Sequence, residues 1–166
     1  MYDHALLSNP ASPNKKGVLI LDISCPYVTV EGKNLKTKAS AIQELYRRQG
    51  VDIVVITFSG KGISIKLPNE EWDETYGKTS LIGTVLNEID SKYGLETPVA
   101  IFGYTKMCRG ISFRSNKRVP SHLLLALGRG HNISTIVQSL GRATFNGKTV
   151  LNQNGFETVT VLMTSR

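Results

Sequence analysis

Short, nearly continuous runs of apolar residues most limit how this chain can fold. The runs GVLILDIS (17–24) and VDIVVITF (51–58) lack the alternation of apolar and polar residues that marks a half-exposed strand. Such runs are typical of strands buried on both faces, as in a parallel sheet that helices cover on both sides. Further strands are expected at GISIKL (62–67), PVAIFG (98–103), SHLLLAL (121–127) and ETVTVLM (157–163).

Segments with helical spacing of apolar residues separate these runs. One helix is expected at 35–50, ended by Gly50, a second from about Ser80 to Gly94, and a third beginning near Asn132. The apolar positions of the first two helices are Leu35, Ala39, Ile42 and Leu45, then Ile82, Val85, Leu86 and Ile89. Strands that alternate with helices predict a three-layer α/β fold, with a mainly parallel sheet and helices on both faces.

The length of 166 residues suits a single domain, which we expect at 17–166 after an N-terminal extension at 1–16. The extension has no apolar run of about seven residues or more, and no segment approaches the roughly 20 apolar residues of a membrane span. We therefore expect a soluble intracellular protein of the nucleus or cytoplasm that does not bind membranes. Cys25 and Cys108 lie far apart without His or Cys neighbours, which argues against a zinc site or a disulfide framework.

The net charge of +7 is concentrated in the C-terminal part of the chain. Residues 97–166 contain nine lysines and arginines and one acid, Glu157, whereas residues 1–96 contain eleven basic and twelve acidic residues. A surface with charge of one sign attracts polyanions, of which nucleic acid is the commonest. A basic face that keeps the domain soluble, or that meets an acidic neighbouring domain, would have the same composition.

Two phrases contain the Gly-Lys-Thr order of a phosphate-binding loop, at 77–79 and at 147–149. Such a loop needs a strand, the pattern G-x-x-x-x-G-K-[ST] and a following helix, because its backbone N–H groups must converge on the phosphates. The first phrase has Trp72 where the first glycine belongs and comes after the acidic run EEWDET, so we expect Thr79 or Ser80 to be a helix N-cap. The second phrase comes after a predicted helix and is expected to form a turn.

Gln138 and Arg142 stand out on the helix expected after residue 132. They are adjacent at i, i+4 and project opposite the apolar stripe, which is formed by Ile133, Ile136, Val137 and Leu140. A solvated helix face would show the same residue types. A functional role is favoured because ligands of α/β sheets bind after the carboxyl ends of strands. The glycine-rich strand end at 128–132 precedes this helix, and the basic segment TKMCRGISF (105–113) comes after the preceding strand.

The ordered set GVLILDIS, VDIVVITFSGKG, GYTKMCRGIS, HLLLALGRGH and IVQSLGRAT resembles the C-terminal RecA-like lobe of superfamily-two helicases. TKMCRGIS is similar to motif V of that family, and QSLGRAT is similar to motif VI. The resemblance extends from about Gly17 to Met163. The longer insert after motif V, FRSNKRVPS, is most similar to the strawberry notch type.

The resemblance implies a role for each matching residue. Arg142 would be the arginine finger that stabilises charge on the γ-phosphate of ATP. The implied ATP-binding residues are Gln138, Arg142, Gly110 and Ser112. The implied nucleic-acid-binding residues, which contact the backbone of DNA or RNA without reading its sequence, are Ser59, Gly60, Lys61, Thr105, Lys106 and Arg109.

The resemblance also implies a partner, because the sequence has no Walker A loop and no acidic Mg²⁺-binding motif. ATP and Mg²⁺ would be bound mainly by a first RecA-like lobe, in cis or in trans, and the isolated chain would not hydrolyse ATP. Two departures, Phe145 in place of a second arginine and Ser112 in place of an aspartate, weaken the expectation of efficient hydrolysis. The alternatives are a non-enzymatic module of the same fold that binds nucleic acid or protein, and a nucleotide-binding enzyme built on 77–79.

Overall fold

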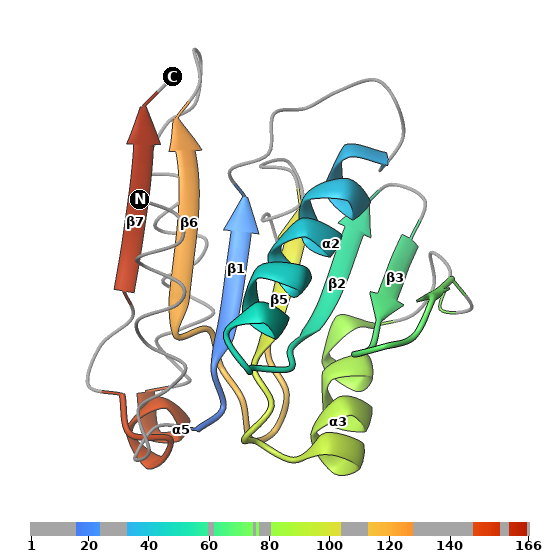
Figure 1. Cartoon of the computed structure of the whole chain (residues 1–166). Coiled ribbons are helices and arrows are strands. Elements are labelled where there is room, and N and C mark those ends of the chain that lie inside the picture. The colour runs from blue at the N-terminus through green and yellow to red at the C-terminus, as the bar shows by residue number, and fades with distance from the viewer. Residues whose placement is uncertain are drawn as a thin grey trace.

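The structure, a computed structural model, describes residues 16–23, 33–59, 62–74, 76, 81–103, 113–127, 148–156 and 160–165. These residues form a seven-stranded sheet in the order β4-β3-β2-β5-β1-β6-β7, with three helices (Figure 1). The strands are β1 (Leu19–Ile23), β2 (Val54–Ser59), β3 (Gly62–Lys66), β4 (Trp72–Asp73), β5 (Val99–Gly103), β6 (His122–Leu127) and β7 (Thr160–Ser165). The helices are α2 (Lys33–Arg48), α3 (Ile82–Tyr93) and α5 (Lys148–Gln153).

The sheet is mixed but mostly parallel, as the apolar runs predicted. Strands β2, β5, β1, β6 and β7 are parallel, whereas β3 pairs antiparallel with β2 and β4 pairs antiparallel with β3. The reason for the reversal is the short connection after β2. Only two residues separate Ser59 from Gly62, and a parallel neighbour needs a crossover of a dozen residues or more. The α/β class is therefore confirmed, with an antiparallel extension at one end of the sheet.

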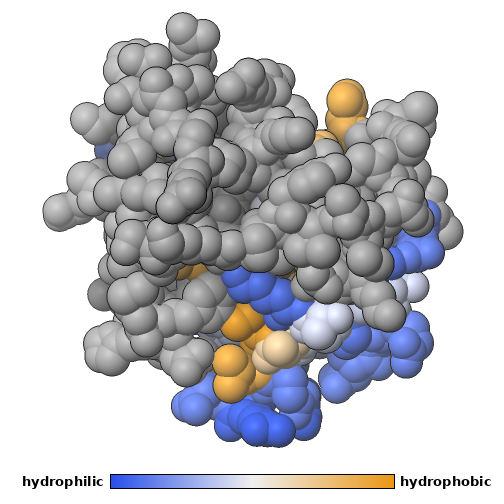
Figure 2. All heavy atoms as spheres, turned by 90° about the horizontal axis from the view of Figure 1, so that it is seen from above, coloured by the Kyte–Doolittle hydropathy of each residue, from blue (hydrophilic) through white to orange (hydrophobic). Residues whose placement is uncertain are grey.

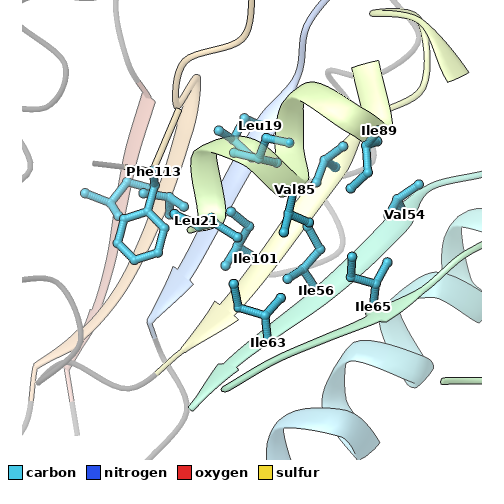
Figure 3. Close-up of a cluster of buried hydrophobic side chains, with 14 residues drawn as sticks. Leu19, Leu21, Val54, Ile56, Ile63, Ile65, Val85, Ile89, Ile101 and Phe113 are labelled. Atoms are coloured by element: carbon cyan, nitrogen blue, oxygen red, sulfur yellow. The ribbon is translucent and has the colours of Figure 1, made fainter. Parts of the chain in front are cut away.

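Both faces of the sheet are covered, which explains why the strand sequences are apolar without alternation. On one face, Leu19, Leu21 and Ile101 lie beneath Val85 and Ile89 of α3 (Figure 3). On the other face, the neighbouring residues of the same strands pack against α2, as Ile20 and Ala100 do. Successive side chains of a strand point to opposite faces, so every position of these strands must be apolar to be buried well.

The two longer helices bury the sides that their sequences predicted, with small differences. All four expected positions of α3 are buried, and Gly94 ends this helix with a φ of 76°. In α2, Tyr46 is buried while Leu45 is half-buried, because the apolar stripe continues one residue further along the helix than expected. The predicted N-cap of α3 is wrong, since Leu81 is its N-cap and forms no side-chain cap hydrogen bond. The turn predicted at 147–149 is also wrong, because Lys148 begins α5.

The described part of the connection between β5 and β6, residues 113–121, contains no helix. Phe113 packs in the cluster beneath α3, and its ring meets that of Phe58 edge-on, with centroids 5.6 Å apart. Further along, the backbone N–H of Asn116 donates to Asn87 Oδ1 on α3 at 2.9 Å. These contacts fix the described part of the connection on α3. None of the helices in the described ranges is both long enough and apolar enough to cross a bilayer.

Candidate functional site

The carboxyl ends of the parallel strands form one edge of the sheet, at the top of Figure 1. In the last rows of the register, Phe58 of β2 lies opposite Gly103 of β5, and Asp22 of β1 lies opposite both Phe102 and Leu124. Strand β1 stands between β5 and β6, so strands that come later in the chain lie on both sides of it. This edge is where ligands bind in open α/β sheets, because the chain leaves neighbouring strands here.

The residues predicted to bind ATP or nucleic acid belong to the segments that come after these strand ends. Ser59 is the last residue of β2, and its backbone is paired with Gly62 of β3. The hairpin therefore fixes both ends of the two-residue connection formed by Gly60 and Lys61, which lie outside the described residues. Also outside them are Thr105, Lys106, Arg109, Gly110 and Ser112, which come after β5, and Gln138 and Arg142, which come after β6.

Asp22 is a candidate residue at this edge that the sequence patterns did not single out. Its carboxylate is buried near the end of β1, and Lys38 Nζ of α2 donates to its Oδ1 at 3.2 Å. The Lys38 side chain is 27% exposed, so the cation of this pair is partly accessible to solvent although the carboxylate is buried. The signal was present in the sequence, because an aspartate within the apolar run LILDI must either be paired or cost stability.

The two faces of the sheet differ in polarity next to this edge. On the α2 face, Thr57 and Asp22 share one row of the register with Phe102. On the α3 face, the ring pair of Phe58 and Phe113 is apolar. Figure 2 views the molecule from above the strand ends, and its coloured residues are mostly hydrophilic, with only small hydrophobic groups among them. Next to this edge, the described polar side chains Thr57 and Asp22 thus lie on the α2 face.

Among the described basic residues of the C-terminal part, Arg118 is not on the surface. Arg118 is fully buried, and its Nε donates to Asp90 Oδ1 on α3 at 2.8 Å. Burial lowers the pKa of Arg118, an effect that the neighbouring Asp90 carboxylate opposes. Arg114, by contrast, is half-buried and Lys117 is exposed. The interpretation of the charge excess as a basic surface is therefore wrong for Arg118, which lies before β6, at the amino edge of the sheet.

Within the described ranges, no group of three or more His, Cys, Asp or Glu side chains could hold a metal ion. The buried carboxylates of Asp22 and Asp90 are each paired with a basic side chain from another part of the chain. Comparisons of the chain with protein-family models, with curated proteins and with solved structures found no match.

Proposed function

We propose that this chain is the C-terminal RecA-like lobe of an ATP-dependent nucleic-acid helicase or translocase. The observation that carries the proposal is the strand order, in which β5 and β6 flank β1. The segment that resembles motif V comes after β5, and the segment that resembles motif VI comes after β6, so both start from the same edge. A lobe that couples nucleotide to nucleic acid needs these two segments near each other, since one contacts the phosphates of ATP and the other contacts the nucleic-acid backbone.

In this proposal Arg142 supplies a guanidinium to the γ-phosphate of ATP, which a first lobe binds together with Mg²⁺. A fixed positive group stabilises the charge that develops as the phosphoryl group is transferred. Gln138, four residues earlier in the sequence, contacts the same nucleotide. Gly110 and Ser112 complete the contacts of this lobe with ATP. The first lobe supplies the phosphate-binding loop, so activity depends on the association of the two lobes.

The nucleic-acid surface of the proposed lobe consists of the β2–β3 connection and the segment after β5. Lys61, Lys106 and Arg109 contribute three positive charges to it, and Ser59, Gly60 and Thr105 contribute hydrogen bonds to phosphate and sugar. Contacts of this kind hold a strand without reading its sequence. Because each neutralised phosphate releases a counterion, three such contacts predict that log K for single strands falls with log salt with a slope of about −2.

Fluorescence anisotropy with a labelled single-stranded oligonucleotide tests this surface. We expect weak, sequence-independent binding with that salt slope. The double variant Lys106→Glu/Arg109→Glu should lose most of this binding. Arg48→Glu is the control, because Arg48 ends α2 at the other edge of the sheet with a side chain 70% exposed. An affinity that salt does not change, or that Arg48→Glu lowers as much as the double variant does, would contradict the proposed surface.

A second candidate is a non-enzymatic module of the same fold that binds nucleic acid or protein. Phe145 and Ser112 favour it, because each replaces a charged residue of the helicase motifs by a neutral one. The helicase lobe predicts nucleic-acid binding by the isolated chain, and the module predicts it only if its ligand is nucleic acid and not protein. They differ in the effect of Arg142 on ATP turnover once a first lobe is present, because only the helicase lobe uses that guanidinium.

A further inference from the structure

A small polar pocket lies at the amino edge of the sheet, away from the carboxyl ends of the strands. It is formed by the second half of α2, by the turn before β2 and by the end of β3, and its volume is about 130 Å³. Its lining residues are Ser40, Gln43, Glu44, Arg47, Asp52, Ile53, Lys66, Pro68 and Asn69. This volume has room for a few water molecules or one small molecule, and is below the roughly 300 Å³ of pockets for drug-sized ligands.

Gln43 forms a rigid wall of this pocket. Its side chain is nearly buried, and its Nε2 donates to the carbonyl oxygens of Ile53 at 3.0 Å and of Lys66 at 3.2 Å. Its Oε1 accepts a hydrogen bond from Lys66 Nζ at 2.6 Å. These three bonds join α2, the turn before β2 and the end of β3, so the Lys66 ammonium is held at the pocket by a neutral partner.

The two acidic groups of the pocket differ in their partners. The Glu44 carboxylate accepts hydrogen bonds from Arg47 Nε at 2.8 Å and Nη2 at 2.6 Å, and Arg48 lies 3.5 Å away. These arginines lower the pKa of Glu44 to about 2, with the hydrogen bond from Arg47 as the largest cause. Asp52 has no hydrogen bond or ion pair with any described residue. The pocket thus contains an ammonium with two hydrogen atoms to spare and the exposed Asp52 carboxylate, which interacts electrostatically with Arg47 without a hydrogen bond.

The balance of charges restricts the ligands that fit. An apolar molecule would strip water from Lys66 and Asp52 without replacing their hydrogen bonds, which costs free energy. A simple anion would meet the carboxylate of Asp52, and a simple cation would meet the ammonium of Lys66. A molecule that carries both charges satisfies both groups. We propose that this pocket binds a small zwitterion, an α-amino acid of the size of glycine or alanine, with its carboxylate on Lys66 Nζ and its ammonium on Asp52.

Amide chemical shifts of the ¹⁵N-labelled chain during titration with glycine test the proposal. We expect saturable shifts confined to residues 40–53 and 66–69, and much smaller ones with acetate or methylammonium, each of which has only one of the two charges. Asp52→Asn and Lys66→Met should each weaken glycine binding about tenfold or more, as expected for the loss of one charge-assisted hydrogen bond. Glu70→Gln is the matched control, since Glu70 is exposed beside the same turn but does not line the pocket.

If Lys66→Met disturbs folding, Asp52→Asn still tests the proposal. This variant should fold normally, because the Asp52 side chain is exposed and forms no hydrogen bond with the described residues. Shifts that do not saturate, or binding of acetate as tight as that of glycine, would overturn the proposal. So would glycine binding that Asp52→Asn leaves unchanged. The pocket and the carboxyl strand ends lie at opposite edges of the sheet, so these results do not depend on nucleic-acid binding.

Discussion

Replacement of Arg118 by methionine tests whether this arginine stabilises the interior or binds nucleic acid. The guanidinium is fully buried, and besides its bond to Asp90 it donates to the carbonyl oxygens of Val18 at 2.6 Å and Gly94 at 3.2 Å. One side chain therefore joins the crossover segment, the start of β1 and the end of α3. Methionine has a similar length and can fill much of the space, but it donates no hydrogen bond.

The expected loss of stability depends on the groups that the substitution leaves behind. The Asp90 side chain is only 6% exposed, so its carboxylate would stay buried without its cation. Removal of one partner of a buried ion pair costs about 3–5 kcal/mol. The two carbonyl oxygens also lose a donor, so we expect a loss toward the upper end of this range. For a chain of this size, such a loss lowers the melting temperature by on the order of 10 °C.

Urea unfolding monitored by circular dichroism measures this loss, and a second variant shows its origin. The double variant Arg118→Met/Asp90→Leu has neither charge of this buried pair. It should therefore be more stable than the sum of the two single losses predicts. Nucleic-acid affinity of the folded Arg118→Met protein should be unchanged. A loss below about 0.5 kcal/mol, the usual effect at a surface position, together with weaker nucleic-acid binding, would refute the assignment of Arg118 to the interior.

Three further expectations concern single groups. Lys38→Met should lower the free energy of unfolding in urea by about 1–3 kcal/mol. This loss is smaller than for a fully buried ion pair, because Lys38 is partly exposed while Asp22 is buried. An NMR pH titration should give Glu44 a pKa of about 2, which Arg47→Gln should raise toward its ordinary value. Since the folded pKa is depressed, any stability from this pair is present above pH 4.5 and is lost as the pH falls toward 2. With a first lobe present, Arg142→Ala should lower kcat about 10³-fold or more, with little rescue by lysine, and unaltered turnover would make Arg142 a surface residue.

The sheet and the buried sides of the helices were predictable because they depend on local patterns. Runs such as LILDI and VVITFS are apolar at nearly every position, and only strands covered on both faces need this. The four buried residues of α3 match the helical repeat in the same way. The antiparallel direction of β3 follows from a different feature. Only two residues separate β2 from β3, and so short a connection can only form a hairpin.

The polar contacts of the interior could not be predicted, because each depends on residues far apart in the sequence. Arg118 lies within the basic insert FRSNKRVPS, where composition alone assigns it to the surface, and its burial depends on Asp90 of α3. Likewise, Asp22 is tolerated in a strand because α2 brings Lys38 beside it. The pocket at the amino edge combines residues from α2, β3 and two turns, so no single stretch of sequence indicates it.

Hydrogen bonds at the amino edge of the sheet hold the starts of β1 and β6. There, Lys16 N–H donates to the Asn154 carbonyl oxygen, and Asn154 Nδ2 donates to the carbonyl oxygen of Lys117. Together with Arg118, these contacts fix the starts of β1 and β6 independently of the loops at their carboxyl ends. Arg118→Met therefore acts on the starts of these strands, so its main effect should be on stability.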